Sequence, residues 1–158
     1  MPKLQLPLAL MLLASPLAAQ AAHYRHHGTA LLPDSVVTPG AVLTTDTARI
    51  CHPGYARSVR HVSGRTKHQA YILYGATRAP SICCEVDHLI SLELGGSNDI
   101  ANLWPEPYQP TPGAYEKDKV ENWLHIQVCA GRIPIEEAQR EIAGDWSVVY
   151  ERMDGEGR

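Results

Sequence analysis

The segment from Val86 to Trp104 constrains the fold of this chain more than any other part of the sequence. It reads V-D-H-L-I-S-L-E-L-G-G-S-N-D-I-A-N-L-W, with short apolar runs on both sides of a glycine pair. Gly95 and Gly96, followed by Ser and Asn, are typical of a turn because these residues accept turn conformations readily. The pattern predicts one or two strands over residues 82–94 and a short second strand that begins at Leu103 and is stopped by the prolines after it.

Helical patterns follow this segment. Residues 114–130 form the clearest one, and Gly131 provides a stop signal after it. The residues on one side of this predicted helix are Val120, Trp123, Leu124, Gln127 and Val128. A second helix is predicted to begin at Pro134, and Gly144 separates it from a last helical stretch at residues 145–152. The fold class predicted from these elements is α+β, a single small domain that ends in a helix or helix pair.

The first 22 residues have the features of a secretory signal peptide. Lys3 precedes an apolar stretch, and Ala19-Gln20-Ala21 is a small-x-small cleavage site. The alternative, a membrane anchor, needs ~20 apolar residues, and this stretch is shorter and interrupted by prolines. We therefore expect an exported protein, periplasmic or secreted, that does not stay in the membrane. Residues 23–46 are predicted to be an extended arm, and residues 47–153 the folded domain.

Four cysteines further restrict the fold: Cys51, Cys83, Cys84 and Cys129. An even number in an exported chain favours two disulfides. No C-x-x-C spacing occurs, so a structural zinc site is not expected. Neighbouring cysteines seldom bond to each other because the geometry is strained. The expectation is that Cys51 and Cys129 each bond to one of the adjacent pair, and both pairings stay open.

Charge is divided unevenly along the chain. The net charge of −3 argues mildly against nucleic-acid binding. Between Thr47 and Cys84, however, there is no Asp or Glu. Five basic residues, arginines or lysine, lie in the part of this stretch before residue 70. Such a basic stretch suits phosphate groups, and we expect Arg57, Arg60 and Arg65 to bind a substrate backbone. The alternative is that these arginines only solvate a surface hairpin.

Asp87 and His88 are the residues with the clearest chemistry. When a carboxylate and an imidazole are adjacent, one side chain can hold a divalent cation while the other activates a water molecule. An imidazole that is neutral near pH 7 is a suitable base for this purpose. The alternative is a buried, hydrogen-bonded polar pair without catalytic activity.

With Asp87-His88, the turn at residues 94–98 and Asn102-Leu103, the sequence resembles the HNH nucleases, also called His-Me finger or ββα-metal nucleases. The resemblance covers residues 84–130, and residues 50–146 are similar to small exported bacterial HNH-like proteins. It implies that His88 is the general base, that Asp87 binds a divalent ion, and that Asn102 orients the loop and His88 itself.

The resemblance further implies an exported, metal-dependent endonuclease that hydrolyses phosphodiester bonds. Its partner would be nucleic acid, DNA before RNA, and no protein partner is identified. The expected ion is Mg²⁺, with Mn²⁺, Ca²⁺ or Zn²⁺ as possible substitutes. One alternative is a non-catalytic exported module that retains the ββα scaffold for binding. Another is a zinc-dependent hydrolase that uses His125, although its ligand set would be incomplete.

The remaining metal ligand departs from the family pattern. The expected His or Asn would fall in the Pro-rich residues 109–111, so the following helix must supply the ligand. At about 100° per residue, one helix face carries Asp118, Asn122, His125 and Cys129, with Glu121 at its edge. A disulfide from Cys129 to the first strand would hold this face over Asp87. Asp118 and Glu121 are then the first candidates, followed by Asn122 and His125. The alternative is a solvated helix face. The three tryptophans are predicted to pack in the core rather than to stack on bases.

Overall fold

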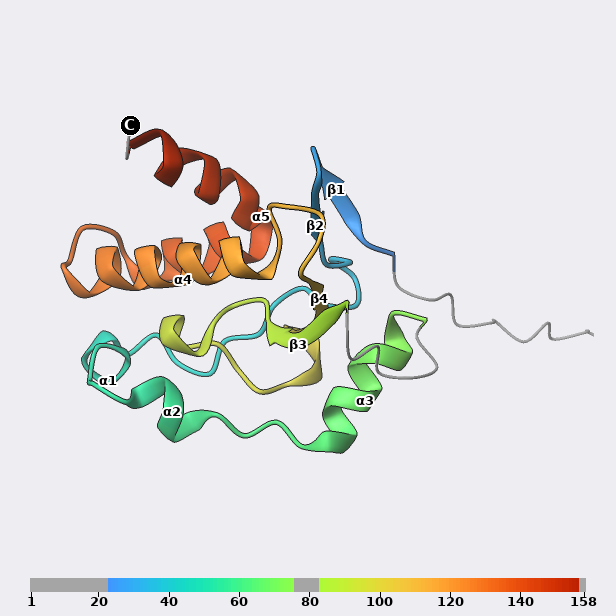
Figure 1. Ribbon diagram of the computed structural model, residues 1–158. Helices are drawn as coiled ribbons and strands as arrows, with labels where there is room; N and C mark the ends of the chain where they lie inside the picture. Colours follow the sequence, from blue (N-terminus) through green and yellow to red (C-terminus); the bar gives the residue numbers. More distant parts are fainter. Residues whose placement is uncertain (1–22, 76–82, 157–158) are drawn as a thin grey trace, which may run out of the picture.

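The computed structural model describes residues 23–75 and 83–156 of the chain, arranged as three layers (Figure 1). Helices α4 (Ala114–Cys129) and α5 (Ile135–Glu156) form one outer layer, and the short helices α1 to α3 form the other. Strands β3 and β4 lie between them. The predicted signal peptide lies outside the described residues. Within the described ranges, no helix has the length and apolarity needed to cross a membrane.

The central hairpin confirms the predicted pair of strands. β3 (Cys84–His88) pairs antiparallel with β4 (Leu103–Pro107), and His88 lies opposite Leu103. β4 begins at Leu103 as predicted and ends at Pro107, whereas Pro105 lies within the strand and does not stop it. A two-stranded sheet has only edge strands, where a residue without an N–H group is tolerated.

The strand region predicted over residues 82–94 ends at His88, and the connection to β4 that follows is not a strand. This connection consists of two 3₁₀ turns, η1 (Leu92–Leu94) and η2 (Ile100–Asn102), on either side of the glycine pair. A Cβ atom at Gly95 would lie 2.2 Å from the Thr44 carbonyl oxygen, and one at Gly96 would lie 1.8 Å from the Ile90 carbonyl oxygen. Only glycine allows these approaches, so this pair fixes the path of the chain from β3 to β4.

Three short helices build the layer beneath the hairpin: α1 (Thr47–Ile50), α2 (Tyr55–Val59) and α3 (Gly64–Leu73). The Asp46 carboxylate caps α1 by accepting hydrogen bonds from two backbone N–H groups, and the Ser63 hydroxyl caps α3 by accepting one from the Thr66 N–H. The basic stretch of the sequence therefore forms a layer of helices.

The N-terminal segment contributes to the fold, in contrast to the predicted extended arm. β1 (Arg25–His27) and β2 (Ala30–Leu32) form an antiparallel hairpin. Ala30 and Leu32 are buried in the hydrophobic core, and the Tyr24 hydroxyl donates to the Pro105 carbonyl at 2.7 Å. The prediction failed because two short strands with few apolar residues give no sustained pattern in the sequence.

Helices α4 and α5 pack together over the main core. Val120, Leu124 and Val128 of α4 are buried against Ile142 and Trp146 of α5. Within α5 the backbone of Asp145 is not helical, which confirms the predicted break after Gly144. Trp104 and Trp146 are core residues as predicted, and Trp123 is partly buried at the edge of the core.

The disulfide pairing corrects the expectation from the sequence. Cys51 bonds to Cys129, and the adjacent residues Cys83 and Cys84 bond to each other. Cys51 follows α1 and lies beside the end of α4, with 5.6 Å between the two Cα atoms, so the long-range bond joins these two helices. No disulfide holds α4 over β3. Asp118, Glu121 and Asn122 were predicted to lie closest to Asp87 on the basis of such a bond, which does not form.

Candidate active site

A buried lysine, Lys117, lies where α4 crosses the end of β3. Its side chain is 1% exposed. The ammonium group donates to the Asp87 carboxylate at 2.7 Å and to the His88 carbonyl at 2.8 Å. It also binds Glu121, one turn later on α4, and lies 3.5 Å from the Glu106 carboxylate of β4. One cation thus connects three carboxylates and the backbone of β3.

The charge states of this cluster follow from burial and from the lysine. Burial alone would raise the pKa of Asp87, but the Lys117 charge outweighs it and lowers that pKa below its ordinary value. Burial raises the pKa of Glu106 well above the usual range and that of Glu121 to about 8. Asp87 and Lys117 therefore form an ion pair near neutral pH, and burial favours the protonated forms of Glu106 and Glu121.

Three carboxylates gather on the outer side of this cluster. The Asp87 side chain is still 21% exposed, Asp118 is exposed, and Glu85 is half-buried. The pKa values of Asp118 and Glu85 are raised, first by burial and then by the charge of Asp87. Mutual repulsion of this kind favours a cation beside the group. Glu85 was not among the residues predicted from the sequence.

The predicted metal ligands are not all brought together. Glu121 is turned toward Lys117, and His125 lies in another pocket. In the described part of the chain, no three His, Cys, Asp or Glu side chains lie close enough to hold a metal ion. Mg²⁺ keeps several waters and is commonly bound by one or two carboxylates plus substrate phosphates. Asp87 with Asp118 fits this mode of binding, whereas the three protein ligands of catalytic zinc are not present here.

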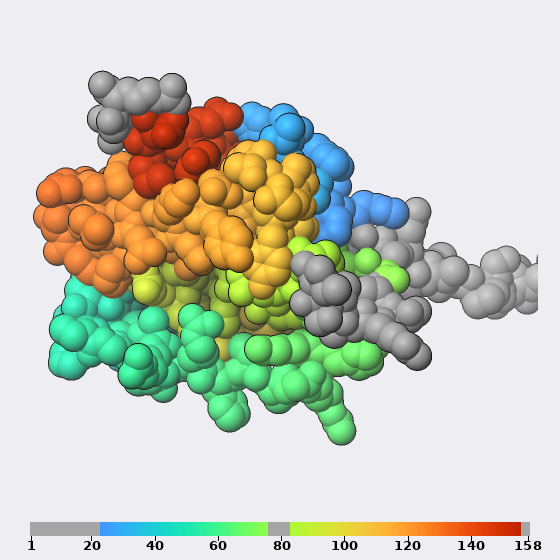
Figure 2. Space-filling model, in the orientation of Figure 1, coloured from blue at the N-terminus to red at the C-terminus, as the bar shows by residue number. Residues whose placement is uncertain are grey.

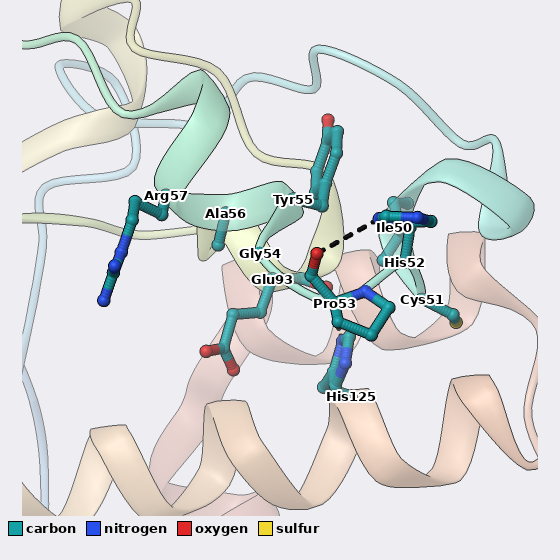
Figure 3. Close-up of a pocket in the computed structure, with 10 residues that line it drawn as sticks. All are labelled: Ile50, Cys51, His52, Pro53, Gly54, Tyr55, Ala56, Arg57, Glu93 and His125. Carbon is teal, nitrogen blue, oxygen red and sulfur yellow. Dashed lines mark hydrogen bonds between the residues drawn. The ribbon is translucent and has the colours of Figure 1, made fainter.

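His125 lies in a pocket of about 480 Å³ between α4 and the turn before α2 (Figure 3). Its Nδ1–H donates to the Glu93 carbonyl at 2.8 Å. In Figure 3, the ring rises from α4 toward Pro53, and Arg57 lies on the far side of Glu93. Two predicted site residues, His125 and Arg57, thus belong to this pocket and not to the Asp87 cluster.

His88 is the last residue of β3 and is only 3% exposed. Its Nε2 lies 3.1 Å from the side-chain oxygen of Asn98. That oxygen also accepts from the His61 N–H at 3.2 Å, while the Asn98 amide nitrogen donates to the Val59 carbonyl at 2.7 Å. These two bonds fix the orientation of the amide, so Nε2 must carry the proton and donate it to Asn98.

The second ring nitrogen of His88 is therefore the basic one. With the proton on Nε2, the neutral imidazole has an unprotonated Nδ1. Burial lowers the pKa of His88, so this neutral form prevails at pH 7. The ring has the protonation state that a general base requires.

Asn102 has one of the two roles that the resemblance implied. Its side chain accepts from the Ile90 N–H and donates to the carbonyls of Ile90 and Ser97, all at 2.9 Å. These bonds hold the loop between β3 and β4. The imidazole of His88 is oriented instead by Asn98, which lies within the predicted turn and was not among the predicted site residues.

A basic pocket of about 270 Å³ adjoins His88. It is lined by Val86 and His88 of β3 and by Arg60, His61, Val62 and Lys67. Arg60 and Lys67 are exposed, and neither forms a salt bridge with another residue in the described part of the chain. Of the three predicted substrate-binding arginines, only Arg60 lines this pocket. Arg65 is exposed on α3. Figure 2 shows β3 and the turns after it between the orange surface of α4 and the green surface of α2 and α3.

Comparison of the chain with known protein families, curated proteins and solved structures found no match. The basis for a function is therefore the site itself. Its parts are an ionised carboxylate, a neutral imidazole with a fixed tautomer, and a basic pocket next to the imidazole.

Replacing Glu121 with Gln is expected to make the protein less sensitive to alkali. The pKa of Glu121 in the folded protein is about 8, above the ordinary value of 4.5, so the folded state binds more protons than the unfolded state between these pH values. Its contribution to stability is complete below pH 4.5 and is lost as the pH rises through 8. Gln cannot ionise and avoids this loss. The free energy of unfolding of E121Q relative to wild type should rise between pH 5 and 9, as measured by urea unfolding at several pH values.

E116Q on the same helix serves as the control. The pKa of Glu116 is lowered, mainly by a hydrogen bond from the Gly113 N–H, so its contribution changes only below pH 4.5. The stability difference between E116Q and wild type should be constant from pH 5 to 9. A constant difference for E121Q as well would contradict the raised pKa of Glu121.

Proposed function

We propose that this protein is an exported, metal-dependent endonuclease that hydrolyses phosphodiester bonds of DNA, or of RNA. The observation that carries the proposal is the basic pocket at His88, where a neutral imidazole with its Nδ1 unprotonated meets Arg60 and Lys67. Export is supported by the predicted signal peptide and by the two disulfides, since such bonds persist in oxidising compartments.

Each residue has a defined part in the proposed reaction. Arg60 and Lys67 bind the phosphates of the substrate. Nδ1 of His88 accepts a proton from the attacking water, and Nε2–H remains bonded to Asn98, which stabilises the imidazolium that forms. Asp87, kept ionised by Lys117, would hold the divalent ion together with Asp118. Such an ion supplies charge neutralisation at the phosphate and the leaving oxygen.

A plasmid-nicking assay on the refolded, oxidised protein tests this proposal. Nicking should require a divalent ion and stop with EDTA. H88A should lose about 10²- to 10⁴-fold in rate, because a positioned general base contributes that much. H68A is the matched control, since His68 is exposed on α3 and does not line the pocket. Because burial lowers the pKa of His88, the rate should fall only when the pH drops below about 6.5, the ordinary value.

Two results would contradict the proposal. Nicking that persists in EDTA and in the H88A variant would come from a contaminant or from another site. Equal losses in H88A and H68A would mean that the effect is not specific to the pocket.

A second candidate function is a non-catalytic nucleic-acid binding module. It is favoured by one observation: the position enclosed by Asp87, Glu106 and Glu121 is taken by the Lys117 ammonium, so these carboxylates are already partly neutralised. This function predicts that the protein binds oligonucleotides but nicks none with Mg²⁺, Mn²⁺, Ca²⁺ or Zn²⁺.

A further inference from the structure

Two tyrosines form an exposed aromatic surface beside the candidate site. Tyr108 follows β4, and Tyr115 is the second residue of α4. Their rings stack with 5.4 Å between the centroids and 25° between the planes. Tyr115 is 61% exposed and Tyr108 is half-buried. Neither tyrosine belongs to the hydrophobic core, and most of the Tyr115 side chain is exposed to solvent.

The backbone holds the tyrosine pair in place. The Tyr108 N–H donates to the Cys83 carbonyl at 2.9 Å, which extends the β3–β4 pairing by one bond. Gly113 lets the chain fold back tightly, since a Cβ atom there would lie 2.6 Å from the Tyr108 carbonyl oxygen. The Gly113 N–H is in turn bound by the Glu116 carboxylate at 3.0 Å. The pair is thus positioned before any ligand arrives, which reduces the entropy lost on binding.

The pair lies close to Asp87. Tyr115 precedes Asp118 by three residues, so their Cβ atoms are ~5–6 Å apart on the same side of α4. Tyr108 lies next to Pro107, which pairs with Cys84 of β3. Cys84 is three residues from Asp87, or ~10 Å at a rise of ~3.3 Å per residue. This span of β3, from the residue opposite Pro107 to Asp87, equals about three nucleotide steps of ~3.4 Å.

The charges around the two sides of the site differ. Next to the tyrosines are Glu85, Asp118 and Glu116, which repel phosphate groups. On the other side, the basic pocket with Arg60 and Lys67 attracts them. A nucleic-acid strand that crosses the site can therefore place its backbone on the cations, and it meets the tyrosines with an uncharged group. The group that stacks best on an aromatic ring is a base.

We propose that Tyr115, supported by Tyr108, stacks an unpaired base of the substrate, so that the preferred substrate is single-stranded or locally melted nucleic acid. The inference rests on the proposed nuclease function, because it treats Asp87 and His88 as the place where the strand is cut. In a duplex the faces of the bases are covered by their neighbours and cannot stack on a tyrosine. Single-stranded binding without sequence preference commonly combines a basic groove with such stacking.

The test measures binding separately from cleavage. The full-length mature protein carries the H88A substitution and is kept in EDTA, so that it cannot cleave. It is titrated into a fluorescein-labelled single-stranded 12-mer and into a labelled hairpin duplex, and fluorescence anisotropy is recorded. Y115A should weaken binding to the single strand by about tenfold and leave duplex binding nearly unchanged. Y115F should bind like the parent, since stacking needs the ring and not the hydroxyl. I126A is the control, because Ile126 is an exposed apolar residue of the same helix.

Unchanged single-strand binding by Y115A would overturn the inference, and so would equal losses for single strand and duplex. Circular dichroism of Y115A shows whether the fold is retained. If it is not, Y115L takes its place, because leucine keeps apolar bulk but has no aromatic ring. The nuclease proposal fails in a different experiment, the nicking assay of wild-type protein. If the wild-type protein cleaves and Y115A binds like its parent, only the stacking inference is wrong. If binding depends on Tyr115 but the wild-type protein does not cleave, only the proposed nuclease function is wrong.

Discussion

Replacing Lys117 with Met is expected to lower the free energy of unfolding by about 3–5 kcal/mol, the cost of removing one partner of a buried ion pair. The ammonium group is bonded to Asp87, Glu121 and the His88 carbonyl, and the lysine side chain is 1% exposed. Met has a similar length but no charge, so the partly buried Asp87 carboxylate would remain without its counter-ion. Urea unfolding at pH 7 without reductant measures the difference.

Lys119, two residues later on the same helix, provides the matched control. Its side chain is 57% exposed and lies 3.3 Å from Glu116. Such surface pairs contribute about 0–1 kcal/mol, so K119M should be nearly as stable as wild type. Adding D87N to K117M should recover part of the lost stability, because the unpaired charge is then removed as well. Equal stability of K117M and K119M would mean that Lys117 is not the counter-ion of the site.

Lys117 also shows where prediction from sequence reached its limit. A lysine four residues before a glutamate on a helix is typical of a solvent-exposed pair. Nothing local distinguishes it from a buried one, because its burial is decided by β3 and β4 passing beneath α4. The helix itself was predictable from its apolar spacing. The side of the helix that meets Asp87 was predicted in part: Glu121 binds Lys117 and Asp118 feels the charge of Asp87, whereas the disulfide from which this side was argued does not form.

The hairpin was easier to predict than the contacts of its side chains. Gly95 and Gly96 indicate a turn because glycine fits conformations and close approaches that other residues do not. Asp87 and His88 were chosen for their chemistry, and the structure places both beside suitable partners. Asn98 as the partner of His88 could not be inferred, because Val59 and His61, which fix its amide, come from the distant α2 region. Such contacts between distant segments follow only from the assembled fold.

The long-range disulfide is expected to contribute about 4 kcal/mol to stability, mainly by restricting the unfolded chain. Cys51 and Cys129 are 78 residues apart, so their bond closes a large loop that contains β3, β4 and most of α4. The double variant C51A/C129A should therefore unfold at a much lower urea concentration than wild type. Below its unfolding transition it should keep the nicking activity, since the bond joins α1 to the end of α4, away from the His88 pocket.

The other disulfide is an internal control for this loop argument. Cys83 and Cys84 are adjacent, so their bond closes almost no chain and restricts the unfolded state little. C83A/C84A should lose much less stability than C51A/C129A under the same non-reducing conditions. An equal or larger loss would show that loop closure is not what the long-range bond contributes. The adjacent pair would then stabilise the start of β3 and, through it, the strand that carries Asp87 and His88.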